Sequence, residues 1–335
     1  MESRDKIGIV GLGLIGGSLA LALRGKYEVV AMSRNPETTA YALGCGMING
    51  VAESYADFAD CRAVIVCVPI GLVKQTVCEL AALLPDVIIS DVGSVKGMLC
   101  GIKGRIIGGH PMAGTEQSGV RAAKERLLEN AYYILTDYNG NADDLEYMKK
   151  LVRDVGAKPV IMNAEEHDRL VGKISHVVHI AAYSLADSML EGDETIVGSG
   201  FMDTTRIASS SPEFWNTVCA LNRGNIVEDI DELTETLTRV RNDIAAGKDI
   251  TPFLAEAKEK RDRLVYKKRY MTEYVLYVDV PDCVGSIAGV LNRLTAQGIS
   301  IENLGVVHAR EGAGGALRIE LKDERDYLKA KEILG

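Results

Sequence analysis

The sequence has no apolar run that approaches the length of a membrane span, and no signal peptide precedes its first predicted strand. Its seven cysteines include no C-x-x-C pair, and most of them lie in apolar segments. We therefore expect no membrane partner and a protein with buried thiols in a reducing cytoplasm.

The chain also lacks an excess of positive charge. It has 38 Lys and Arg residues against 47 Asp and Glu residues, which gives a formal net charge of -9. This balance argues against a nucleic-acid partner or an anionic membrane surface, so an anionic substrate must be held by a few local cations. The 335 residues, 47% of them hydrophobic, suffice for two or three domains with ample core.

A glycine-rich turn lies close to the N-terminus. The apolar strand 6–10 precedes Gly11, Gly13 and Gly16, and a helix-forming run over residues 18–23 follows. This is G-x-G-x-x-G between a strand and a helix, the arrangement that holds the pyrophosphate of a dinucleotide at a helix N-terminus. The alternative, a glycine turn that binds nothing, is disfavoured by the flanking strand and helix.

The acidic residue typical of NAD sites is missing. The second strand, 28–32, ends at Ser33 and Arg34, where such sites usually have Asp or Glu for the ribose hydroxyls. Arg34 can pair with a 2′-phosphate, which favours NADP over NAD, unless it is simply a solvated loop residue. The candidate cofactor contacts are Gly11, Gly13, Leu14, Ile15, Gly16, Ser33, Arg34, Val68 and Pro69.

Three regions differ in their hydrophobic pattern. Strand-like and helix-like runs alternate over residues 1–162, which predicts a Rossmann-like doubly wound sheet. Long helical patterns over 165–190, 228–246 and 251–268 predict an all-helical domain at 163–268, whose apolar positions favour interdigitation in a homodimer. Period-2 alternation returns in residues 271–335, with a predicted βαββα order.

His110 is the most informative ionisable residue. It directly follows a short predicted strand, 105–109, and opens a Gly/Ser-rich loop that includes Thr115 and Glu116. A second polar loop, Asp91 to Lys96 with Ser94 at its centre, precedes it. In a parallel sheet both loops lie at the carboxyl edge, where ligands bind.

The helical domain adds three candidate groups. His176 and His179 share a face of a predicted helix, either as core histidines or, less well supported, as metal ligands; no third ligand is signalled, so we predict no metal. Arg206 lies in a predicted small-residue loop and suits a substrate carboxylate, the alternative being a salt bridge to Asp203 or Glu213. The single tryptophan, Trp215, is expected in the core.

Five motifs together resemble the prephenate dehydrogenase family, over residues 6 to about 268. They are the Gly11–Gly16 turn and the segments 91–96, 110–116, 175–179 and 201–208. The tail from about residue 271 resembles an ACT domain, a small ferredoxin-like regulatory module. The resemblance implies NAD- or NADP-dependent oxidative decarboxylation of prephenate to 4-hydroxyphenylpyruvate in tyrosine biosynthesis, or of arogenate directly to tyrosine.

The resemblance also implies roles for individual residues. His110 would take the proton of the substrate's ring hydroxyl, and Ser94 would bond the same hydroxyl and orient His110. Arg206 would hold a substrate carboxylate, His179 would position the side chain, and Thr115 and Glu116 would line the loop. Met202 stands where the family often has Lys or Arg, which leaves the choice between prephenate and arogenate open.

The tail is expected to bind tyrosine as a feedback effector. Backbone amides at the helix that follows Asp282 and Gly285 are candidates for its carboxylate, with Asn303 near a facing strand end; the alternative is a purely structural tail. Two other functions compete with the enzyme assignment. A 3-hydroxyacid dehydrogenase would rely on a lysine such as Lys173, and a non-catalytic sensor of NADP and amino acids would not need His110 and Ser94 in neighbouring loops.

Overall fold

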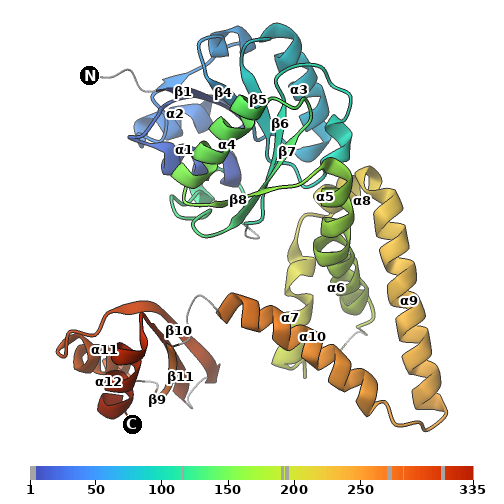
Figure 1. The fold of residues 1–335 in the computed structure, drawn as a ribbon, viewed down its shortest axis with the longest axis vertical. Helices are drawn as coiled ribbons and strands as arrows, with labels where there is room; N and C mark the ends of the chain where they lie inside the picture. The colour runs from blue at the N-terminus through green and yellow to red at the C-terminus, as the bar shows by residue number, and fades with distance from the viewer. Residues whose placement is uncertain are drawn as a thin grey trace. The chain divides into compact units, whose positions relative to one another are not determined.

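The computed structural model describes residues 5–114, 117–189, 192, 196–269, 274–281, 283–310 and 314–334. Within it the chain divides into two compact units, residues 1–236 and 237–335, which we describe separately (Figure 1). Thr115, Glu116 and Asp282, three of the candidate site residues, lie outside the described residues.

A five-stranded parallel sheet forms the centre of the first unit. Its strand order is β3-β2-β1-β4-β5, and the strands are β1 (Lys6–Val10), β2 (Glu28–Met32), β3 (Gly50–Val51), β4 (Ala63–Val66) and β5 (Ile88–Asp91). The strands β1, β4 and β5 are almost wholly buried and mostly apolar, as expected for parallel strands covered on both faces, and β5 ends in the buried polar residues Ser90 and Asp91. Three helices connect them: α1 (Leu14–Leu23), α2 (Pro36–Gly44) and α3 (Ile70–Leu83). The predicted Rossmann-like parallel sheet is confirmed.

The remaining strands of this unit form a second sheet, where we expected one continuous sheet. Its order is β6-β7-β8, with β6 (Ile107–Pro111), β7 (Tyr132–Asp137) and β8 (Lys158–Ile161); α4 (Ala142–Asp154) joins the last two. β6 runs antiparallel to β7, and the backbone bridge to β5 among the described residues, between Ile89 and Ile106, lies just before β6. Beyond Ile106 the two sheets share no backbone ladder, although β5 and β6 stay in contact.

A helical segment completes the first unit. Its elements are α5 (Ala164–Val171), a π-helical turn (Gly172–His176), α6 (Val177–Asp187), α7 (Ser199–Thr205), a 3₁₀ turn (Arg206–Ser209), α8 (Pro212–Leu221) and α9 (Arg223–Ala245). The side chain of Asn163 caps α5, and that of Ser211 caps α8 ahead of Pro212. The helical character is confirmed, but the loop predicted around Arg206 is wrong, because α7 and the 3₁₀ turn occupy it.

Two apolar clusters fill the first unit, one on each face of the parallel sheet. The second cluster includes Trp215, Val218 and Ile226, so α8 and α9 share a core with α3 and the sheet. This confirms the core assignment of Trp215, which is 7% exposed. The helices α8 and α9 of this segment therefore pack on the same core as the parallel sheet.

The expectation of buried thiols is wrong for most of the cysteines. All seven are free, but Cys45, Cys78, Cys100 and Cys283 are exposed and only Cys61 is buried. Apolar neighbours in the sequence do not decide which face of a helix a residue occupies. Burial raises the pKa of Cys61 to about 12, so this thiol stays protonated.

The second unit contains the end of α9, α10 (Thr251–Arg269) and five further elements. These are β9 (Tyr274–Val280), α11 (Ser286–Thr295), β10 (Ile301–Arg310), β11 (Gly314–Leu321) and α12 (Glu324–Leu334), in the predicted βαββα order. The strands form an antiparallel sheet of order β10-β11-β9, with a small core of its own. Within the described part of the chain, no helix is both long and apolar enough to cross a membrane.

Candidate functional site

The glycine turn between β1 and α1 has the backbone that a dinucleotide site requires. Gly11 has a φ of 100°, and a Cβ on it would lie 2.6 Å from the carbonyl oxygen of Cys67; a Cβ on Gly16 would lie 2.1 Å from that of Gly11. At Gly13 a Cβ would meet no described atom within 4 Å, so the space beside the turn is open. The first amides of α1 have no intrahelical acceptors and are available to an anion. The turn therefore fits the pyrophosphate of a nicotinamide dinucleotide.

The other candidate cofactor residues follow parallel strands of the same sheet. Ser33 and Arg34 come directly after β2, and Val68 and Pro69 lie between β4 and α3. Because the strands are parallel, these segments share the carboxyl edge with the glycine turn. The side chain of Arg34 is exposed, and Ser33 is half-buried. The sheet thus brings the predicted cofactor contacts to one edge.

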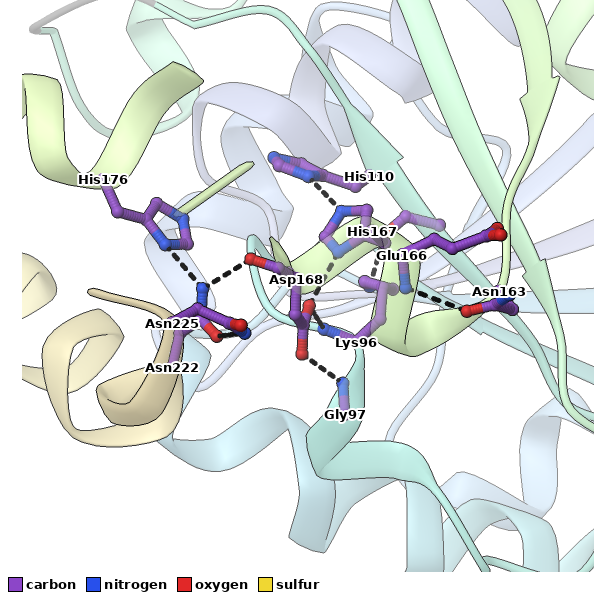
Figure 2. Close-up of polar contacts among 12 residues, drawn as sticks. Lys96, Gly97, His110, Asn163, Glu166, His167, Asp168, His176, Asn222 and Asn225 are labelled. Atoms are coloured by element: carbon purple, nitrogen blue, oxygen red, sulfur yellow. Dashed lines mark hydrogen bonds and ion pairs between the residues drawn. The ribbon is translucent and has the colours of Figure 1, made fainter. Parts of the chain in front are cut away.

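His110 lies inside β6 and is only 8% exposed (Figure 2). Its Nδ1 is 2.8 Å from Nε2 of His167 on α5, and Nδ1 of His167 is 2.7 Å from Oδ1 of Asp168. Asp168 also accepts hydrogen bonds from the backbone amides of Lys96 and Gly97, each at 2.7 Å. These contacts form a buried chain that runs from His110 through His167 to Asp168.

The chain of contacts defines the tautomers. A carboxylate only accepts hydrogen bonds, so His167 donates from Nδ1 to Asp168 and, when neutral, accepts at Nε2. His110 must then donate from Nδ1, which leaves the lone pair on its Nε2 available. This is the arrangement of a general base whose orientation is fixed by a second group.

The electrostatics keep His110 neutral. Burial lowers the pKa of His110 well below its ordinary value, and the charges of His167, Lys96 and His176 act in the same direction. Burial alone would raise the pKa of Asp168, but the hydrogen bonds from His167, Lys96 and Gly97 outweigh it, so that pKa lies below its usual value. The neutral imidazole of His110 is therefore linked through His167 to the ionised carboxylate of Asp168.

His176, at the end of the π-helical turn, is the second buried histidine of the site. Nδ2 of Asn222 donates to the carbonyl oxygen of Asp168 at 2.8 Å and lies 3.1 Å from Nδ1 of His176. Since an amide nitrogen cannot accept, His176 accepts at Nδ1 and carries its proton on Nε2. That buried Nε2 has no hydrogen-bond partner among the described residues. Burial lowers the pKa of His176 to about 4.

His179 and Arg206 form the more open side of the site. His179 donates from Nδ1 to the carbonyl oxygen of Ser175 at 2.9 Å, and its ring stacks on Trp215 with centroids 3.7 Å apart. Burial lowers the pKa of His179, and the charge of Arg206 acts in the same direction. The 3₁₀ turn that contains Arg206 packs against α6, which carries His179. Arg206 is exposed. A cation next to two stacked rings suits an anionic substrate with an unsaturated ring.

Ser94 lies in the loop between β5 and Lys96 and is half-buried. Within the described residues, the hydrogen bond that orients His110 comes from His167, and none joins Ser94 to His110. The predicted contact of Ser94 with a substrate hydroxyl stays a prediction. Among the described residues, no three His, Cys, Asp or Glu side chains are grouped so that they would hold a metal ion.

The sequence motifs did not identify His167, Asp168 or Asn222. One signal for the first two was available: the buried positions of α5 are Ala164, His167, Asp168 and Val171, the i, i+3, i+4, i+7 spacing of a helix face turned to the core. Two polar residues on such a face need partners in the interior. Asn222, at the end of α8, carries no comparable sequence signal.

Comparison with known proteins finds matches along most of the chain. Residues 19–161 match the nucleotide-binding domain of prephenate dehydrogenase, and residues 163–259 match its dimerization domain. The prephenate dehydrogenase of Bacillus subtilis is 33% identical over 99% of this chain and 96% of its own length.

Two solved structures are similar over about three quarters of the chain. The prephenate dehydrogenase of Aquifex aeolicus, in complex with hydroxyphenyl propionate and NAD+, is 31% identical with a TM-score of 0.71, over 78% of this chain and 99% of its own. The Synechocystis arogenate dehydrogenase is 28% identical with a TM-score of 0.68, over 77% and 99%. The chain belongs to the prephenate dehydrogenase family of nicotinamide-dependent oxidoreductases.

Proposed function

We propose that this chain oxidises and decarboxylates prephenate and that Nε2 of His110 is the base of the reaction. The observation that carries this proposal is the buried chain of His110, His167 and Asp168, which leaves one lone pair of a neutral imidazole available. Membership of the prephenate dehydrogenase family supports prephenate as the substrate. The tautomers of His110 and His167 support His110 as the base.

The reaction needs one proton acceptor and precise positioning. His110 takes the proton of the ring hydroxyl while the hydrogen on the same ring carbon leaves as hydride. The bound nicotinamide would accept that hydride. The carboxylate on the opposite ring carbon departs as CO₂, and its bonding electrons complete the aromatic ring. His110 then returns its proton to the ring oxygen, which gives 4-hydroxyphenylpyruvate. Formation of the aromatic ring drives the step. The protein therefore needs mainly to orient the substrate and to supply a base that is shielded from water.

Hydrogen-bond donors and one cation surround the place we assign to the substrate. Arg206 would hold a substrate carboxylate, and Ser94 would contact the ring hydroxyl. His179 would position the substrate's side chain, with Trp215 supporting its imidazole. The unpartnered Nε2–H of His176 is a further donor for a substrate oxygen. Thr115 and Glu116 stay in the proposal on the sequence motif alone.

The decisive experiment is to follow reduced-cofactor absorbance with the purified full chain. Prephenate and arogenate are each offered with NAD and with NADP. We expect turnover with prephenate, and arogenate as the alternative is supported by the likeness to the Synechocystis enzyme. No turnover in any of the four combinations would refute the proposed function. Ser33 and Arg34 favour NADP over NAD in this assay.

We also propose a homodimer formed through the helical segment. Large apolar side chains are exposed along α6 and α9, among them Val178, Leu185, Val227 and Leu233. Such faces on two helices are typical of an interface. Sedimentation at micromolar concentration should give twice the chain mass, and a monomer would contradict the proposal. The cytoplasmic location stays a prediction.

The βαββα tail is proposed to be an ACT domain that binds tyrosine. Gly285 has a left-handed φ of 92° and begins α11, so amides at this helix start are available to a carboxylate. Asn303, on β10, is exposed and donates to Glu320 at 3.2 Å. Truncation after Arg269 should preserve turnover and remove most non-competitive inhibition by tyrosine. Inhibition that is unchanged and competes with substrate would assign tyrosine to the active site instead.

A further inference from the structure

Lys96 and Asp91 form a buried ion pair that the proposed reaction does not use. Both side chains are 0% exposed, and Nζ of Lys96 is 2.5 Å from Oδ2 of Asp91. Nζ also donates to the carbonyl oxygen of Gly109 at 2.6 Å, and Oδ1 of Asp91 accepts from the amide of Gly109 at 3.1 Å. The pair therefore binds both polar groups of the residue immediately before His110.

The ion pair lies where the two sheets separate. The bridge between Ile89 and Ile106 lies just before β6, so among the described residues Gly109 has no ladder partner on β5. Its backbone amide and carbonyl would be buried and unsatisfied without other partners, which is unfavourable for each group. The side chains of Lys96 and Asp91 take the place of the missing ladder. A Cβ on Gly109 would lie 2.5 Å from the carbonyl oxygen of Asp91, which shows how closely the strands approach.

Lys96 also holds the far end of the histidine chain. Its amide donates to Oδ1 of Asp168 at 2.7 Å, and its carbonyl oxygen accepts from the hydroxyl of Tyr138 at 2.7 Å. The backbone of Lys96 thus contacts the carboxylate that orients His167, while its side chain contacts the peptide that carries His110. One residue fixes both ends of the chain.

A charged pair is not required merely to fill this space. Replacing a buried ion pair by neutral residues of similar volume is often neutral or stabilising, because desolvation of two charges is costly. What the pair adds here is a positive charge close to a base that must stay neutral. Burial lowers the pKa of Lys96, and the charge and hydrogen bond of Asp91 oppose that shift, which is why the cation needs its counter-ion. The charged or titratable groups that act on His110 are His167 from α5, His176 from the π-helical turn and Lys96 from the loop after β5.

We propose that Lys96, with Asp91 as its counter-ion, is a positioning residue for the reaction: it holds His110 in line with His167 and supplies the buried positive charge beside it. The proposal rests on the assignment of His110 as the base. Two consequences are separable. The hydrogen bond to Gly109 affects the geometry of His110, and the charge of Lys96 disfavours protonation of its imidazole.

Two double variants separate the hydrogen bond from the charge. Asp91→Asn with Lys96→Met removes the charges and the donor to Gly109, whereas Asp91→Asn with Lys96→Gln removes the charges and retains a donor. The matched control is Arg105→Met with Asp144→Asn, which removes the ion pair that joins the residues before β6 to α4. Circular dichroism verifies that each variant is folded.

For the Met double variant we expect kcat to fall by about 10- to 100-fold at the pH plateau, with a smaller change in KM, because the base is misplaced. The Gln double variant should recover most of kcat. In both, the acid limb of the rate profile should move to higher pH, since the nearby cation is gone. The control should change none of these. A folded Met double variant with the plateau kcat and acid limb of the wild type would overturn the proposal.

A second measurement does not depend on the reaction. NMR titration of the His110 ring, one of five histidines in the chain, reports its protonation in the substrate-free enzyme. Its midpoint should rise in the Gln double variant, and an unchanged midpoint would refute the role of the charge even where the Met variant does not fold. If the wild type fails to turn over prephenate, the proposed function fails, but this titration still decides the effect of Lys96.

Discussion

The glycine turn and the histidine chain, which we assign to the cofactor and the substrate, are built by opposite means. The turn between β1 and α1 offers backbone amides beside an open space. The chain around His110 consists of side chains that are buried, hydrogen-bonded and charged. The first is therefore sensitive to added atoms and indifferent to charge, whereas the second is sensitive to every charge and proton in its interior.

The largest effect we expect is from His110→Asn. Loss of a positioned base typically costs about 10² to 10⁴ in rate. The substitution should lower kcat by that factor and leave the melting temperature and the substrate KM close to those of the wild type. Near-normal turnover would show that His110 is not the base of the reaction. The histidine chain would then differ from the glycine turn in structure only.

The pH dependence of turnover should follow the protonation of His110. Its folded-state pKa is lowered, so the imidazole is neutral above that value and kcat is constant through the neutral range. The rate should fall only as the pH drops through the lowered pKa, well below 6.5, and then about tenfold per unit. A stopped-flow profile that already declines through pH 6.5 would contradict this.

Arg206→Gln tests the open side of the histidine cluster. A charge-assisted contact to a substrate carboxylate is worth about 2 kcal/mol, or roughly 30-fold in binding. We expect the substrate KM to rise by that factor while the cofactor KM stays constant. Arg153→Gln, an equal charge change at an exposed position of α4, is the control and should have no effect. If only the cofactor KM changed, Arg206 would belong to the cofactor site and not to the substrate site.

Gly13→Ala tests the glycine turn by adding one methyl group. It meets no described protein atom, so stability should be unaffected, but it enters the space that we assign to the pyrophosphate. We expect the cofactor KM to rise about tenfold, or ~1.4 kcal/mol, with kcat unchanged. Gly44→Ala on α2, also without a contact within 4 Å, is the matched control. A normal cofactor KM would show that the turn does not approach the ligand.

The smallest effect should come from Arg34→Ala. The side chain is exposed, and an exposed ion pair is worth at most about 1 kcal/mol. The preference for NADP over NAD, measured as the ratio of kcat/KM values, should fall by about two- to fivefold. An unchanged ratio would mean that Arg34 faces solvent only.

Regular periodicity and local motifs explain which elements were predictable. The parallel strands, α9, α10 and the βαββα tail follow from apolar spacing that each segment carries itself. The separation of β6–β8 from the first sheet does not, because it depends on which strand edges meet. The helix α7 was missed because Gly and Ser in its sequence favour a loop, and the 3₁₀ turn that contains Arg206 follows it directly.

The sequence by itself determined the glycine turn and singled out His110 as a candidate. The glycine turn presents the backbone groups of neighbouring residues, so a short stretch of sequence is enough to predict it. Only the tertiary structure decided how His110 is held, because His167, Asp168, Lys96 and Asn222 come from separate segments and meet only in the folded interior. Whether a histidine is neutral, and which nitrogen carries its proton, depends on those partners and on burial, and neither is a property of its neighbours in the chain.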